Sequence, residues 1–108
     1  MKTMISIAKD FSESPMARYR HEGPNSGERF RDDYLVPALK QGSPVTVDLD
    51  GVVGFGSSFL EEAFGGLVRK GYRKQQLESS LKINASLATY RDRVWRYIAD
   101  ADKKAGRK

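Results

Sequence analysis

The chain has 108 residues, a net charge of +5, one histidine and no cysteine. This length fits a single domain spanning residues 1–108, and the lack of cysteine excludes a disulfide framework, a thiol nucleophile and a thiolate zinc site. No apolar run approaches the ~20 residues of a membrane helix, and charged side chains interrupt residues 1–20, where a signal peptide would be apolar, so we expect a soluble, cytoplasmic protein without membrane association.

The first third of the chain predicts a strand, a turn and a helix. Residues 4–11 contain alternating isoleucines and are expected to form the opening strand. Residues 18–21 are expected to add a short second strand after a Ser/Pro turn. Ser26 is a good N-cap residue, and the apolar side chains that follow it recur at helical spacing, which predicts a helix over residues 27–41.

The middle of the chain predicts a strand, a glycine-rich loop and a strongly amphipathic helix. Residues 45–49 are short and β-branched and lie between a proline and an Asp-Gly pair, as is typical of a buried strand. Apolar residues at spacings of three and four predict a helix over residues 58–70. Ser58 and Glu61 form a Ser-x-x-Glu pattern, which predicts that the helix begins with Ser58 as its cap.

The last third predicts a strand over residues 76–86 and a helix over residues 86–105, followed by a short tail. Strands and helices then alternate along the chain, which indicates an α/β domain with a mixed sheet of about four strands and helices packed on it. In such sheets ligands bind beyond the carboxyl ends of the strands. We therefore expect the functional edge at residues 48–58.

Glycines at three positions dominate this edge, namely Gly51, Gly54 and Gly56. Glycine lets a backbone turn sharply or approach a ligand closely, and the helix start that follows offers free N–H groups to an anion or a phosphorylated serine. The pattern is neither a P-loop nor a dinucleotide-binding fingerprint. The alternative is a tight strand-to-helix connection in which Ser58 is only a cap.

Carboxylates lie at the same edge. Asp48 and Asp50 alternate at the end of the predicted strand and can bind a divalent cation or an arginine of a partner, or they can simply form a polar strand end and turn. Glu61 and Glu62 lie in the first helical turn, where the helix dipole favours negative charge. Since the chain shows neither a nucleophile with a base nor a metal-ligand cluster, we expect no enzymatic activity, no cofactor and no metal.

Residues 18–21 carry Arg18, Tyr19, Arg20 and His21 ahead of a Gly-Pro loop. Their side chains can bind a phosphate or a carboxylate of a partner, or they can belong to an exposed edge strand. The histidine lies between charged neighbours, which is typical of a solvated surface group, and nothing in the sequence supplies it with a Ser-His-Asp set.

Positive charge is concentrated at the end of the chain. Residues 1–68 carry seven basic and ten acidic side chains, whereas residues 69–108 carry twelve and four. Basic residues with interleaved aromatics resemble a nucleic-acid-binding surface; a solvated helix face explains them equally. The candidate nucleic-acid contacts in the C-terminal region, residues 86–108, are Arg91, Arg93, Trp95, Arg96, Lys103 and Lys104.

Two segments, RYRHEGPNSGERFRDDYLVPAL and VTVDLDGVVGFGSSFLEEAFGGLVR, resemble the STAS-like family of unknown function found in bacteria. The resemblance covers residues 4–87, and its most specific stretch is SSFLEEAFG. Ala17 stands where the family often has glycine, and Glu22 where it often has aspartate. The resemblance implies a small STAS-like fold.

STAS domains include the anti-sigma-factor antagonists, in which a kinase of the histidine-kinase-like fold phosphorylates a serine at the start of the second helix. The resemblance places Ser58 on that serine, with Ser57 beside it, and Gly56 where the aspartate before the serines would be. It implies a regulatory protein-interaction module that docks a histidine-kinase-like ATPase or serine kinase. The expected partner-binding residues are Arg18, Tyr19, Asp48, Asp50, Gly51, Gly54, Gly56, Ser57, Ser58, Phe59, Glu61 and Glu62. The alternative function is a nucleic-acid-binding accessory protein that uses the basic C-terminal helix.

Overall fold

The computed structural model describes residues 3–42 and 44–106. At its centre is a parallel sheet in which the order of the strands is β1-β2-β3. The strands are β1 (Thr3–Ser6), β2 (Val45–Asp48) and β3 (Leu81–Asn84). The described residues therefore form three strands, all parallel, and the expected mixed sheet of about four strands is not confirmed.

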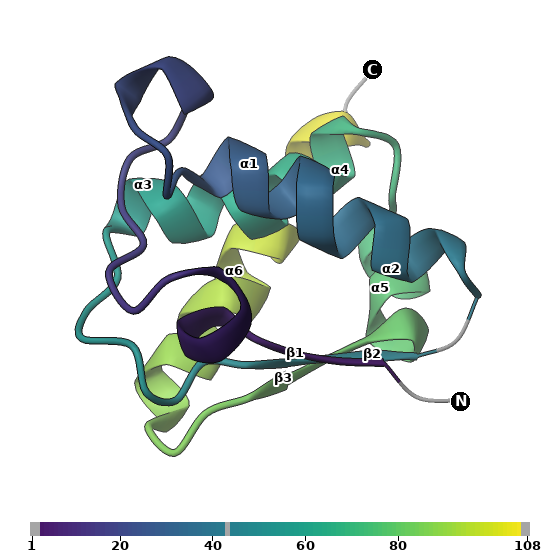
Figure 1. Ribbon diagram of the computed structural model, residues 1–108. Coiled ribbons are helices and arrows are strands. Elements are labelled where there is room, and N and C mark those ends of the chain that lie inside the picture. Colours follow the sequence, from purple (N-terminus) through teal and green to yellow (C-terminus); the bar gives the residue numbers. More distant parts are fainter. Residues whose placement is uncertain (1–2, 43, 107–108) are drawn as a thin grey trace.

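One face of the sheet is buried and the other is open. The row Ile5–Val47–Ile83 is buried, whereas the adjacent row Met4–Thr46–Lys82 points to the opposite face, where Met4 is 68% exposed. Figure 1 shows the sheet nearly edge-on with α1 to α4 above it. Alternating burial of this kind is the pattern of a sheet that packs on one side only.

The opening strand is shorter than its isoleucine pattern predicts. It ends at Ser6, and Ile7–Phe11 form a single wide helical turn, η1. The Ser6 hydroxyl accepts a hydrogen bond from the backbone N–H of Lys9, and Asp10 accepts one from the N–H of Ser6 at 2.8 Å. These local bonds compete with the sheet ladder, while Ile7 stays fully buried without being in the strand.

The predicted second strand at residues 18–21 is wrong, because the chain forms a 3₁₀ turn there, η2 (Arg20–Glu22). The carboxylate of Glu22 accepts hydrogen bonds from the N–H groups of Arg18 and Tyr19 at 3.1 and 2.9 Å, so these donors are not free for a sheet. Ala17, just before the turn, has a φ of 80°. This left-handed conformation favours glycine.

The first helix runs without interruption over residues 27–40, as α1 (Gly27–Phe30), η3 (Arg31–Leu35) and α2 (Val36–Lys40). Ser26 caps it by accepting a hydrogen bond from the N–H of Arg29 at 3.2 Å, which confirms the predicted start.

The central helix covers residues 57–69, as α3 (Ser57–Leu60), η4 (Glu61–Gly65) and α4 (Gly66–Arg69). It packs between the first helix and α6, and it contains the longest run of buried side chains in the chain. Its N-cap is Gly56 and no side chain caps it, so the predicted Ser58 cap is wrong by two residues.

Helix α5 (Lys74–Ser80) occupies the first half of the predicted strand over residues 76–86. Its N-terminus is fixed by Asp102, which accepts hydrogen bonds from the side chain of Arg73 at 2.8 Å and from the N–H of Lys74 at 2.9 Å. Helix α6 (Ala88–Ala105) agrees with the predicted last helix, and the tail beyond Gly106 lies outside the described residues. No helix in the described part of the chain is long and apolar enough to cross a membrane.

Candidate docking edge

The carboxyl ends of the parallel strands and the loops beside them form one edge of the molecule, which we call the docking edge and define as residues 13–19, 50–58 and 84–87. Figure 1 shows the loop after β2 running up this edge to the start of α3. The N–H of Val53 donates to the carbonyl of Glu13 at 2.8 Å and so holds two of the three segments together. The third segment is held by Asp48, the last residue of β2, and by Asp50.

Asp48 and Asp50 bind the protein's own backbone and side chains. Asp48 accepts hydrogen bonds from the N–H of Asp50 at 3.0 Å and from the amide of Asn84 at 3.3 Å. Asp50 accepts from the N–H and the hydroxyl of Ser86, both at 2.8 Å, and these bonds lower the pKa of Asp50. The described residues contain no group of three or more acids or histidines that can hold a metal ion. Both carboxylates thus join the loops after β2 and β3.

Only one glycine of the loop is required by its geometry. Gly51 has a φ of +91°, and a Cβ there would lie 3.1 Å from the Cβ of Ala8. Gly54 and Gly56 have open space around the position of a Cβ and φ values outside the left-handed region. Gly51 therefore meets the protein itself, whereas a close approach of a ligand to Gly54 or Gly56, where the space is open, stays a prediction.

The start of the central helix presents two exposed serines. Ser57 and Ser58 are exposed, and their hydroxyls form no hydrogen bond within the described ranges. Phe59, in contrast, is fully buried, so it supports the helix from inside and is not available to a partner. The two serines line a hollow of about 410 Å³ together with Ala17, Arg18, Tyr19, Glu22 and Gly56.

The charged residues one turn further along the helix bind each other. Glu61 accepts from Arg69 at 2.8 and 3.0 Å and also pairs with Arg18. Burial of Glu61 favours its neutral form, but the hydrogen bonds from Arg69 and Arg18 outweigh it and lower the pKa of Glu61. Arg18 and Glu61, two of the expected partner-binding residues, thus belong to an internal ion-pair network, and their binding of a partner stays a prediction.

Glu62 is the buried centre of the same network. It is 6% exposed and pairs with Arg31, which is 5% exposed, and with Arg18 and Arg69, each at 3.2 Å. Asp32 pairs with Arg31 at 2.8 Å from the first helix. The network fixes residues 18 and 31 to the central helix, so Glu62 is structural and closed to a partner.

Two neighbours of Arg18 have different environments. Arg20 pairs with Asp33 at 2.7 Å on the surface. Tyr19 is exposed and its ring stacks on that of His21, with the ring centroids 5.7 Å apart. Of the predicted residues before the Gly-Pro loop, Tyr19 and His21 remain open at the surface.

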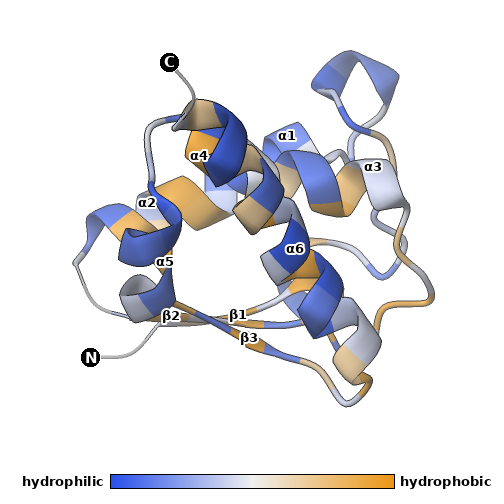
Figure 2. Ribbon diagram, turned by 180° about the vertical axis from the view of Figure 1, so that it is seen from behind, coloured by the Kyte–Doolittle hydropathy of each residue, from blue (hydrophilic) through white to orange (hydrophobic). Residues whose placement is uncertain are grey.

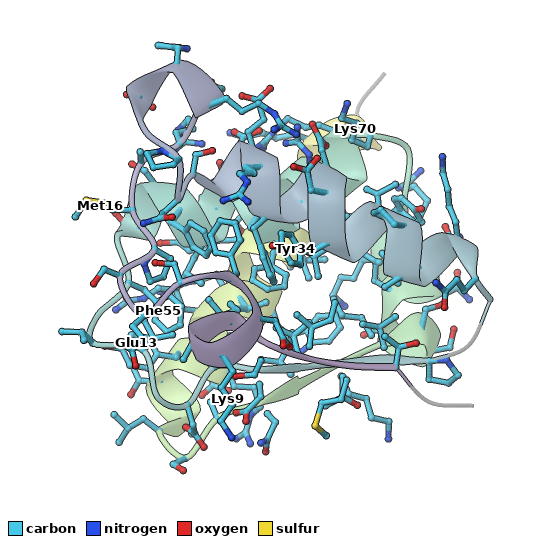
Figure 3. The ribbon with its side chains drawn as sticks, viewed as in Figure 1. Lys9, Glu13, Met16, Tyr34, Phe55 and Lys70 are labelled. Atoms are coloured by element: carbon cyan, nitrogen blue, oxygen red, sulfur yellow. The ribbon has the colours of Figure 1, made fainter. Side chains whose placement is uncertain are left out.

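The sequence did not single out the exposed apolar residues of the docking edge. Val53 is 84% exposed and Met16 is 62% exposed. They line a second hollow of about 340 Å³, which adjoins the first at Gly56 and whose other residues are Ser14, Pro15, Gly54 and Phe55. Figure 3 shows Met16, Phe55 and Glu13 on the same side of the molecule. Their only signal in the sequence is that they are large apolar residues within Gly/Pro-rich segments.

A family model described as a STAS-like domain of unknown function (DUF4325) matches residues 26–86. The chain belongs to this STAS-like family. The match runs from the cap of the first helix through the docking-edge loop and the central helix to the loop after β3. The search of curated proteins and the search of solved structures gave no match.

The basic residues predicted to contact nucleic acid lie along α6, whose ribbon alternates between hydrophilic and hydrophobic residues in Figure 2. Arg91, Arg96, Lys103 and Lys104 are exposed, and Arg93 is half-buried. Trp95 is half-buried against the core, and Tyr90 packs on Phe55 with 5.2 Å between the ring centroids. The structure thus keeps the predicted basic face but turns its aromatic rings partly inward.

Proposed function

We propose that this STAS-like domain is a non-enzymatic regulatory module that binds a protein partner through its docking edge. The observation that carries the proposal is the exposure of Val53 and Met16 beside two unbonded serine hydroxyls. Large apolar side chains at the centre of a polar rim are typical of protein interfaces. The partner-binding residues of this proposal are Met16, Tyr19, Val53, Phe55, Ser57 and Ser58.

The family resemblance supports a partner of the histidine-kinase-like ATPase or serine-kinase class, with Ser58 as the phospho-acceptor and Ser57 as its neighbour. Ser58 precedes Glu61 by three residues and therefore lies on the same side of the central helix. A phosphate would add about −1.5 to −2 charge there. It would repel Glu61 and compete with it for Arg18, which lines the same hollow. Phosphorylation would thus change the docking edge without entering the core.

Calorimetric titration with the histidine-kinase-like ATPase encoded nearest to the gene tests the proposal. We expect Val53→Asp to weaken binding at least about tenfold, because it places a charge at the apolar centre of the interface. Met4→Asp is the matched control, since Met4 is also a largely exposed apolar residue but lies on the open face of the sheet. Equal affinity of the wild type and Val53→Asp would refute the docking edge.

Mass spectrometry after incubation with the ATPase, ATP and Mg²⁺ tests the modification separately. We expect one phosphate, which Ser58→Ala removes and Ser57→Ala retains. If Ser57→Ala loses the phosphate and Ser58→Ala keeps it, the phosphorylated residue is Ser57. If the wild type forms the complex but carries no phosphate, regulation by phosphorylation of Ser58 is refuted, whereas binding through the docking edge is not.

Nucleic-acid binding through α6 is the second candidate. Arg93 and Arg96 have no ion-pair partner in the part of the chain that the structure describes, and they flank a hollow of about 330 Å³ with Thr89 and Asp92. Binding through phosphates must weaken steeply as salt rises. Fluorescence anisotropy with labelled single-stranded and double-stranded DNA at two salt concentrations tests it, and absence of binding at low salt excludes it.

A further inference from the structure

The docking edge has an apolar centre between an acidic and a basic flank. Val53 and Met16 form the exposed centre. Glu13, on one side, is exposed and has no ion-pair partner among residues 3–42 and 44–106. Arg93 and Arg96 lie on α6, which adjoins the docking edge through the contact of Tyr90 with Phe55, and they also lack an ion-pair partner over the same residues.

A chain of contacts in the structure connects these parts in a single row. The backbone carbonyl of Glu13 accepts a hydrogen bond from the Val53 N–H at 2.8 Å, and Phe55 lines the same hollow as Val53. The ring of Phe55 lies 5.2 Å from that of Tyr90, and the guanidinium of Arg93 lies 5.9 Å from the Tyr90 ring. The surface therefore runs from acid through apolar side chains to base.

We propose that this row is the interface between two copies of the chain, related by a twofold axis through the apolar centre near Val53. A twofold axis places each patch against an identical patch, so an interface of this kind must be complementary to itself. An apolar centre with opposite charges at its two ends meets this condition. Val53 packs against Val53 of the second copy, and Glu13 of each copy faces Arg93 and Arg96 of the other.

Charge and size favour this occupant. Asp92 pairs with Arg91 at 3.8 Å, so Glu13 together with Arg93 and Arg96 leaves the patch a net charge of only +1, which is little to attract a phosphate backbone. The patch exposes far fewer apolar residues than an obligate dimer buries. We therefore expect weak pairing, with a dissociation constant of about 10–100 µM. The inference does not rest on the proposed kinase or ATPase, but it implies that pairing and docking of such a partner exclude each other.

Sedimentation velocity of the full chain, from about 5 to about 500 µM to bracket this weak affinity, tests the pairing. The wild type is expected to shift from monomer to dimer over this range, and Val53→Asp is expected to stay monomeric. Met4→Asp, on the open face of the sheet, should behave as the wild type. A wild type that is monomeric throughout, or a Val53→Asp variant that still dimerises, would overturn the proposal.

A charge exchange tests the twofold arrangement. Glu13→Arg alone and the double variant Arg93→Glu/Arg96→Glu alone are each expected to lose dimerisation, because like charges then face each other across the axis. An equimolar mixture of the two should restore it, since each acidic flank again meets a basic one. Failure of the mixture to associate would overturn this interface. Because these assays contain no ATPase, their failure would leave the proposed function untouched.

Discussion

Replacement of Glu62 by Gln removes the charge at the buried centre of the ion-pair network while keeping the size of the side chain. Arg31, 5% exposed, would then have Asp32 as its one remaining carboxylate partner in the described structure. Leaving a buried charge short of its partner typically costs 3–5 kcal/mol. Since Asp32 remains, we expect about 3 kcal/mol, which lowers the Tm by about 12–24 °C for a domain of this size.

Urea unfolding followed by the fluorescence of Trp95, the only tryptophan, measures this change. Asp33→Asn is the control, because its pair with Arg20 is exposed at the surface and such pairs contribute little. The double variant Arg31→Met/Glu62→Met should recover most of the loss, since hydrophobic residues of similar volume replace both charges. A loss below about 1 kcal/mol in Glu62→Gln would refute the view that the network is desolvated.

Three further predictions concern the backbone and pH. Gly27→Ala is expected to lower the free energy of unfolding, measured with urea, by about 1–3 kcal/mol, because the added Cβ would lie 2.5 Å from a carbonyl oxygen of the central helix. Gly54→Ala is the control and should be neutral, because Gly54 lies in open space. Equal effects of the two substitutions would contradict the close packing at Gly27. Ala17→Gly should raise the free energy of unfolding by up to about 1 kcal/mol by relieving the left-handed conformation, and a loss of stability would contradict this. The pKa values of Glu61 and Asp32 are lowered in the folded protein. Their contribution to the free energy of unfolding is therefore present above the unfolded pKa of about 4 and is lost as the pH falls through the folded pKa values. Urea unfolding at pH 7 and at about pH 3 should show this loss of stability, and unchanged stability would contradict it.

The sequence predicted those elements whose signals are local. The first helix was predicted because Ser26 is a cap and the apolar spacing follows it directly, and both features are found in the structure. Helix α5 was missed because Leu77 is its single buried residue and its start is fixed by the distant Asp102. The predicted strand at residues 18–21 failed because the carboxylate of Glu22 takes up the local N–H groups.

The sequence predicted that residues 50–58 lie at the carboxyl ends of the strands, but not which side chains are exposed there. Alternating aspartates and glycines after β2 indicate a strand end, and Ser57 and Ser58 do lie exposed beyond it. The internal pairing of Arg18 with Glu61 joins segments distant in sequence, so spacing alone does not reveal it. The exposure of Val53 likewise depends on how its loop is held by Glu13.

The docking edge itself is tested most directly by amide chemical-shift mapping of the isotope-labelled domain titrated with the histidine-kinase-like ATPase encoded nearest to the gene. We expect the largest shift changes at residues 13–19 and 50–58, with little change on the open sheet face around Met4 and Lys82. Shift changes confined to the open face or to α6 beyond Arg96, with residues 50–58 unaffected, would contradict the account.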